Sequence, residues 1–171
     1  MQNISVEEAW KEISGSFSWS ETLLEKYQDK VDWEEISKNR EIHWTIPMLR
    51  KFQKKINWDK LSEFIDSDGI TENMIEAFKN QWNWHELSNN ITFTHELLEK
   101  YADRWDWSVI IKGDYRFHRD YRHNDNCIFE KGIDFFERYK EHIPISKLQE
   151  SSLWEKIVKQ QKNQLIEEIK S

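Results

Sequence analysis

Hydrophobic and polar positions along the chain follow a pattern that recurs about every 25 residues. Its clearest marker is a Trp that follows Asp or Asn and is itself followed, three positions later, by Ile or Leu. The marker occurs at Trp33, Trp58, Trp84 and Trp107, with spacings of 25, 26 and 23 residues. A period of this length predicts a stack of small repeating units that share one core.

A second motif keeps the same period as the Trp motif. Ser20, Thr45, Thr71 and Thr94 each precede a Leu or Ile by four positions and an aromatic residue by seven. A hydroxyl at this place is typical of a helix N-cap, because its oxygen accepts a hydrogen bond from an unpaired backbone N–H. Each repeat is therefore predicted to begin with a helix of about ten residues.

The Trp motif predicts a second, shorter helix in every repeat. Its expected N-caps are Asp32, Asn57, Asn83 and Asp106. Glu35 and Glu86 follow their caps by three positions, which predicts capping boxes. Asn39, Asn90 and Gly113 are expected to end these helices in the left-handed conformation.

Both helices of each repeat are expected to be fixed by hydrophobic staples, in which the residue before the cap packs on the fourth helical residue. The pairs are Trp19–Leu24, Val31–Ile36, Trp44–Leu49, Ile56–Leu61, Ile70–Ile75, Trp82–Leu87, Phe93–Leu98 and Trp105–Ile110. Isolated helices this short are marginal in water, so neighbouring repeats must supply the core. The sequence thus predicts an all-α, α-solenoid-like stack of helix pairs, with the four motif Trp side chains buried between repeats.

The chain is expected to form a single repeat domain over residues 1–171. Its predicted parts are an N-terminal cap at 1–16, four Trp repeats at 17–111, an insert at 112–132, and a degenerate repeat with a C-terminal capping helix at 133–171.

Both ends of the chain are predicted to act as caps. Ser5 and Glu8 predict a capping box in an opening half-repeat. Ser152 and Glu155 predict the start of a last helix that continues to about Lys170. The expected apolar stripe of this helix is Trp154, Ile157, Val158, Leu165 and Ile169. Ahead of it, the degenerate repeat is predicted from Phe135, Phe136 and Tyr139 in a first helix and Ile143, Ile145 and Leu148 in a second.

The segments LLEKYQDKVDWEEISKN and LLEKYADRWDWSVI carry a resemblance. This pattern resembles tandem Trp-containing helical repeats of uncharacterised proteins from large DNA viruses, phages and some bacteria. The resemblance covers residues 17–111 and, more weakly, 132–150. It implies an α-helical repeat scaffold and supplies no catalytic residue to assign to this chain. The viral and phage members imply a small inhibitor that binds a host protein.

Composition narrows the classes of function. The formal charge of −7 disfavours a general nucleic-acid binder, and the single Cys excludes an internal disulfide framework and suits a reducing compartment. The opening segment MQNISVEEAW has no apolar core typical of a signal peptide, and no apolar run is long enough to span a membrane. We therefore expect a cytoplasmic protein with no membrane partner.

The insert is the one place where the period breaks. About a dozen extra residues interrupt the repeat, and residues 115–123 carry a local charge of +2 with neutral histidines. The candidate partner-binding residues are Tyr115, Arg116, Phe117, Arg119, Tyr121 and Arg122. Arg and Tyr anchor protein interfaces, and Arg interleaved with aromatic rings can also stack on bases.

Three classes of function remain open from these residues, and the third of them is an enzyme that acts through His118, His123 and Asp120. The favoured one is a non-enzymatic module that binds a protein partner, with no catalytic residue, cofactor or metal. The alternative is a nucleic-acid or nucleotide binder that uses the insert 115–123. His118, His123 and Cys127 have spacings that zinc accepts, but no fourth ligand is specified, so loop histidines and a buried thiol are preferred.

Overall fold

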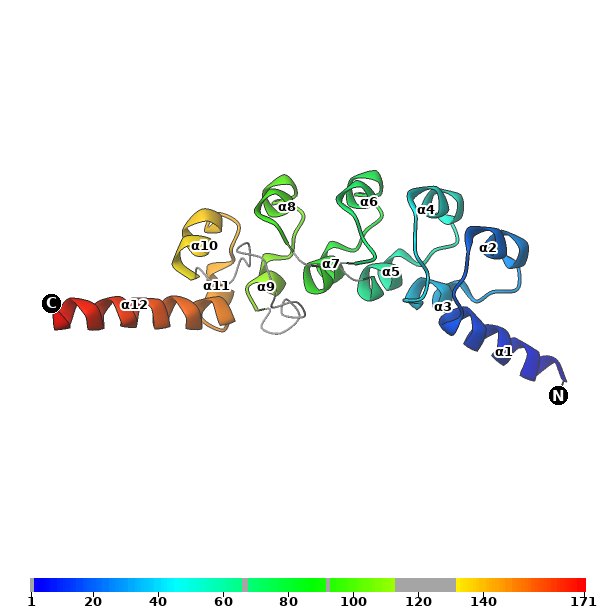
Figure 1. Ribbon diagram of the computed structural model, residues 1–171, viewed down its shortest axis with the longest axis horizontal. Coiled ribbons are helices and arrows are strands. Elements are labelled where there is room, and N and C mark those ends of the chain that lie inside the picture. Colours follow the sequence, from blue (N-terminus) through cyan, green and yellow to red (C-terminus); the bar gives the residue numbers. More distant parts are fainter. Residues whose placement is uncertain (1, 66–67, 92, 113–131) are drawn as a thin grey trace. The chain divides into compact units, whose positions relative to one another are not determined.

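The computed structural model describes residues 2–65, 68–91, 93–112 and 132–171 (Figure 1). Within these ranges every regular element is a helix, which confirms the all-α prediction. The chain divides into two compact units, Met1–Ile91 and Thr92–Ser171, and each is described by itself. No described helix is both long enough and apolar enough to cross a membrane.

The first unit consists of a long N-terminal helix followed by pairs of short helices. Its helices are α1 (Gln2–Ser16), α2 (Glu21–Tyr27), α3 (Trp33–Lys38), α4 (Ile46–Phe52), α5 (Trp58–Phe64), α6 (Glu72–Ala77) and α7 (Trp84–Asn90). The second helices of successive pairs pack on one another, because α3 contacts α5 and α5 contacts α7. The end of α1 takes the equivalent place before α3, while α2, α4 and α6 line the other side of this unit (Figure 1).

The predicted N-caps are confirmed throughout the described repeats. The first helices start at hydroxyl caps, each of which accepts a hydrogen bond from a backbone N–H: Ser20, Thr45, Thr71 and Thr94. The second helices start at carboxylate or amide caps that do the same: Asp32, Asn57, Asn83 and Asp106. A cap of this kind stabilises a helix by about 1 kcal/mol, so the caps explain how such short helices have sharp starts.

The predicted capping boxes at Glu35 and Glu86 are wrong. A capping box requires the cap's own N–H to bond the Glu side chain. The N–H of Asp32 instead donates to Ser14 Oγ at 2.9 Å, and that of Asn83 donates to Ser62 Oγ at 3.0 Å. A hydroxyl from the preceding second helix, or from the end of α1, has taken the place of the Glu.

The predicted left-handed helix ends are also wrong. No described residue other than Gly has a positive φ, and no described Gly has one either. Asn39 has φ −75° and ψ 112°, and Asn90 is the last helical residue of α7. These two amides are used for contacts between repeats, as shown below. Gly113 lies outside the described residues.

The staple residues form the core of both units. All of the predicted staple residues are buried, and Leu24, Ile36, Leu87, Leu98 and Ile110 are 0% exposed. Burying a Leu or Ile side chain contributes about 1.5–3 kcal/mol, so this apolar ladder is the main source of stability.

The motif Trp side chains are less buried than predicted. Trp107 is 5% exposed, whereas Trp33, Trp58 and Trp84 are half-buried. The indole N–H of each of the four donates to the carbonyl five residues earlier, at 2.7–3.0 Å. The rings of Trp33 and Trp58 also pack on an aromatic side chain of the next helix pair, with centroids 5.1 and 5.2 Å apart. The same bond is therefore compatible with a buried ring at Trp107 and with partly exposed rings at Trp33, Trp58 and Trp84.

The second unit contains the fourth helix pair and the predicted degenerate repeat. Its helices are α8 (His95–Lys100), α9 (Trp107–Ile110), α10 (Gly132–Tyr139), α11 (Ile145–Leu148) and α12 (Ser152–Lys170). Trp107 packs against Tyr139 of α10, with ring centroids 5.1 Å apart. Phe135 and Leu148 are buried, while Ile145, at the position of the motif Trp, is 63% exposed.

The end helices differ from the prediction in two ways. Residue Ser5 lies inside α1 and is not a cap, because the helix already begins at Gln2. The cap of α12 is Ser151, one residue before the predicted start, and its hydroxyl accepts from the N–H of Trp154. The apolar stripe of α12 is not buried as expected, because only its first turns pack on α10.

The second half of the apolar stripe of α12 is exposed to solvent. Leu165 and Ile169 are 54% and 84% exposed. At the packed end, a Cβ added to Gly132 would lie 3.2 Å from the backbone nitrogen of Ile157, so α10 approaches α12 closely there.

Candidate functional site

The insert residues predicted to bind a partner all fall within 113–131, outside the described residues. They are Tyr115, Arg116, Phe117, Arg119, Tyr121 and Arg122. His118, His123 and Cys127, the candidate metal ligands, lie there as well. Among the described side chains, no three His, Cys, Asp or Glu are grouped so that they could hold a metal ion. The described residues offer a different site, at a junction between two helix pairs of the first unit.

In the first unit a buried Ser joins α1 to α3, α3 to α5 and α5 to α7. Ser14, Ser37 and Ser62 each donate their hydroxyl to the carbonyl four residues earlier, at 2.6–2.7 Å. Each hydroxyl oxygen also accepts the N–H of the next second-helix cap, at 2.9–3.0 Å. The hydroxyl is thus paired on both sides, and it fixes how each helix pair sits on its neighbour.

Asn side chains seal two of these junctions. Asn39 Nδ2 donates to the carbonyls of Ser14 and Phe17, at 2.7 and 2.9 Å, between α1 and α3. Asn90 Nδ2 donates to the carbonyls of Ser62 and Glu63, at 3.1 and 2.5 Å, between α5 and α7. A carbonyl at the end of a helix lacks an intrahelical partner, so these amides replace the water that it would otherwise need.

The α3–α5 junction lacks such an amide. Phe64 stands at the position that Asn39 and Asn90 occupy in their repeats. The backbone carbonyl of Ser37, the equivalent of that of Ser62, receives no hydrogen bond from any described side chain. The phenyl ring of Phe64 has no N–H group to donate, so the carbonyl of Ser37 is left without a side-chain donor.

The same junction holds a buried donor without a partner. Trp44 is 6% exposed, and its Nε1 is the one buried side-chain nitrogen or oxygen without a hydrogen bond in the described part of the chain. Trp19, one repeat earlier, donates to the carbonyl of Ile13 at 3.2 Å. The equivalent carbonyl for Trp44 is that of Ile36, and the indole N–H of Trp44 makes no bond to it. Leaving a buried N–H unpaired costs about 1–3 kcal/mol.

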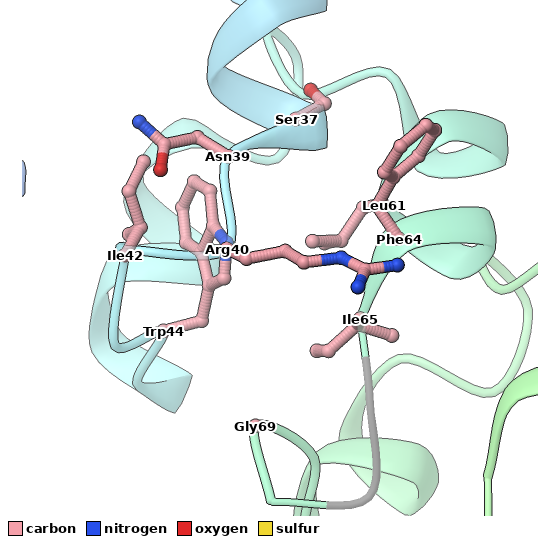
Figure 2. A pocket seen from close by; sticks show the side chains of 9 residues that line it. All are labelled: Ser37, Asn39, Arg40, Ile42, Trp44, Leu61, Phe64, Ile65 and Gly69. Atoms are coloured by element: carbon pink, nitrogen blue, oxygen red, sulfur yellow. The ribbon is translucent and has the colours of Figure 1, made fainter. Parts of the chain in front are cut away.

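These groups line one pocket of about 30 Å³, which we call the junction pocket (Figure 2). Its lining residues are Ser37, Asn39, Arg40, Ile42, Trp44, Leu61, Phe64, Ile65 and Gly69. Figure 2 shows the side chain of Arg40 extending across the pocket from the side of Trp44 toward Phe64 and Ile65. A space of this size holds one or two water molecules or one small polar group.

Positive charge at the pocket comes from Arg40. Its guanidinium lies over the ring of Phe64, 5.8 Å from the centroid, and makes no ion pair among the described residues. Two lysines on the same helices are already bound: Lys38 donates to Glu35 at 3.1 Å, and Lys60 to Glu63 at 2.7 Å. These hydrogen bonds raise the pKa of both ammonium groups.

The arrangement is suited to binding a polar group. It presents one buried N–H donor, one carbonyl without a side-chain donor, and the cation of Arg40, beside apolar walls formed by Ile42, Leu61 and Ile65. A group that both donates and accepts would satisfy the site, and the apolar walls would exclude competing water.

The pocket is not predicted by the sequence pattern, in which Asn39 and Asn90 are expected to end helices and Phe64 has no expected role. The available signal was the exchange of Asn for Phe at one register position of otherwise matching repeats. That signal becomes meaningful only once the amides are known to bridge repeats.

Comparisons with protein-family models, with curated proteins and with solved structures found no match to this chain. The resemblance to tandem Trp repeats therefore stays a prediction.

Proposed function

We propose that this chain is a non-enzymatic protein-binding module, built as an α-solenoid whose surface holds a protein partner. The observation that carries the proposal is the contrast between constant interior and variable exterior in the first unit. Ser14, Ser37 and Ser62 repeat the same bonds in successive repeats. In contrast, the exposed position held by Thr22 in α2 is Pro47 in α4 and Asn73 in α6. Repeat scaffolds bind through surfaces of this kind, because outward residues carry little of the packing.

Two surfaces are available for a partner under this proposal. One is the junction pocket, where a buried donor and a free cation face the same small space. The other is the insert, whose Arg and aromatic residues are typical of interface centres. A viral or phage inhibitor of a host protein is the narrower form of the proposal and rests on the resemblance alone.

The experiment is capture followed by calorimetry. The intact chain is immobilised, proteins retained from an extract of its source cells are identified, and the affinity of the purified partner is measured at low and high salt. The proposal expects a saturable one-to-one complex whose affinity falls only modestly with salt. Binding of bare nucleic acid with a steep salt dependence would instead support the alternative function, because released counterions make phosphate contacts salt-sensitive.

Two triple variants then test the insert. Changing Arg116, Arg119 and Arg122 to Ala is expected to weaken the complex at least about tenfold, since Arg at an interface centre contributes strongly. The matched control removes three exposed, unpaired lysines elsewhere: Lys54, Lys147 and Lys162 to Ala. Equal affinities for both triple variants would remove the insert from the interface and leave the surface of the repeats.

A further inference from the structure

The junction pocket carries an inference that rests on the proposed function and sharpens it. We propose that the pocket binds a carboxamide, the terminal CONH₂ of an Asn or Gln side chain presented by the protein partner. The partner's amide then takes the place that the chain's own Asn side chains hold in the neighbouring junctions.

The first argument is the chain's own use of amides. In the α5–α7 junction, Asn90 Nδ2 reaches the carbonyls of Ser62 and Glu63. The equivalent carbonyls in the α3–α5 junction belong to Ser37 and Lys38, and Phe64 cannot reach them with a donor. Because these carbonyls receive no side-chain hydrogen bond among the described residues, an NH₂ group from outside the chain can bond them.

The second argument is the pairing of donor with acceptor. A carboxamide accepts through its oxygen and donates through its nitrogen, so it can take the N–H of Trp44 and give to the carbonyl of Ser37. A carboxylate has no proton for that carbonyl, and an ammonium has no lone pair for the indole. Arg40 adds a second donor for the amide oxygen from the rim.

The third argument is the fit of the space. The pocket admits one or two water-sized groups, and the polar atoms of a terminal carboxamide are of that size. The walls of Ile42 and Leu61 are 5% and 2% exposed, so they are placed to contact the aliphatic stem of Asn or Gln. The carboxamide therefore meets polar groups of the pocket, and the aliphatic part of the same side chain meets its apolar walls.

The test uses the full chain labelled with ¹⁵N and follows the indole N–H resonances of its ten Trp residues. Propionamide is the probe, propionate and propylammonium are the matched controls, and Trp44→Phe assigns the Trp44 signal. We expect propionamide to shift the Trp44 signal saturably, at about 10–100 mM for so small a ligand. The two controls are expected to leave that signal unchanged or to move it without saturation.

A variant then closes the pocket from within. Phe64→Asn supplies an internal amide and is expected to weaken propionamide binding at least about tenfold, while Phe64→Leu retains it. Absence of a saturable shift in the wild-type chain would overturn the proposal and leave bound water as the occupant. Stronger binding of propionate than of propionamide would overturn it in favour of a carboxylate. The wild-type titration decides even if Phe64→Asn fails to fold.

The outcome is separable from that of the proposed function. If the captured partner binds wild type and Phe64→Asn equally, the carboxamide inference fails while the protein-binding module stands. If no partner is captured but propionamide saturates the pocket, the site stands and the proposed function fails.

Discussion

The α5–α7 and α3–α5 junctions of the first unit share the same kinds of core contact and differ at two register positions. The sealing position holds Asn90 in the first junction and Phe64 in the second, and the staple position before the first helix holds Ile70 and Trp44, respectively. Each has a buried Ser that bridges to the next cap, a staple pair, and a motif Trp that covers the preceding helix. In the α5–α7 junction Asn90 donates hydrogen bonds to the carbonyls of Ser62 and Glu63 at the end of α5. In the α3–α5 junction Phe64 leaves a carbonyl without a side-chain donor, and Trp44 adds an unpaired indole N–H at the same pocket. The difference teaches that the stack is held by its apolar core and its Ser bridges, so one sealing amide can be given up for binding.

The largest expected effect is the loss of a sealing amide. Asn39→Ala removes three hydrogen bonds, two to carbonyls and one from the N–H of Glu41, at a residue that is 4% exposed. We expect a loss of about 3 kcal/mol in the free energy of unfolding, because the buried carbonyls stay unpaired. Urea denaturation measures it, with the exposed Asn89→Ala as the control, expected within about 0.5 kcal/mol of wild type. Equal losses in both variants would contradict a sealing role.

The next effect concerns the Ser bridge that both junctions share. Ser62→Ala deletes a hydroxyl that donates to Trp58 and accepts from Asn83, so a buried N–H loses its partner. The expected loss is about 2 kcal/mol by urea denaturation, against little change for the exposed Ser146→Ala. A loss no larger than that of the control would show that water replaces the bridge and that the junctions are wetter than described.

A smaller effect separates the two staple Trp residues. Trp19→Phe and Trp44→Phe both replace an indole with a phenyl ring. Phe93 occupies this position in another repeat, so Phe is accepted there. Trp19 loses its bond to Ile13, whereas Trp44 loses only an unpaired N–H. We expect Trp19→Phe to be more destabilising by about 1 kcal/mol in thermal or urea unfolding. If Trp44→Phe costs as much or more, its indole has a partner in solution.

The smallest effect is expected from closing the open junction. Phe64→Asn gains hydrogen bonds and loses a half-buried ring, so the free energy of unfolding should stay within about 1 kcal/mol of wild type. Phe64→Leu serves as the control for the loss of the ring alone and should be the less stable of the two. The reverse order, measured by urea denaturation, would mean that the new amide makes no bond.

The sequence predicted the caps and the core well because these depend on local physics. Ser20 and Asp32 bond N–H groups two or three residues away, and Leu24 and Ile36 follow a helical spacing. Contacts between repeats were predicted poorly. Glu35 lost its expected bond to Ser14, a residue 18 positions from the cap that it serves, and no local pattern encodes such a competitor.

The candidate site was missed for the same reason. Asn39 bonds carbonyls 22 and 25 positions earlier, so its role is visible only when neighbouring repeats are stacked. Only then can Phe64 be recognised as the residue that replaces a bridging Asn at this register position. The burial of Trp33 and Trp58 was overestimated because a motif's regularity does not tell whether its ring lies between the helices or at their edge.

The most direct test of the account is a crystal structure of the Phe64→Asn variant. The account predicts that the new side-chain amide donates to the carbonyls of Ser37 and Lys38, as Asn90 does to those of Ser62 and Glu63, and that the junction pocket is filled. An amide that points into solvent, beside an unchanged pocket, would contradict the claim that this one position decides whether the junction is sealed or open.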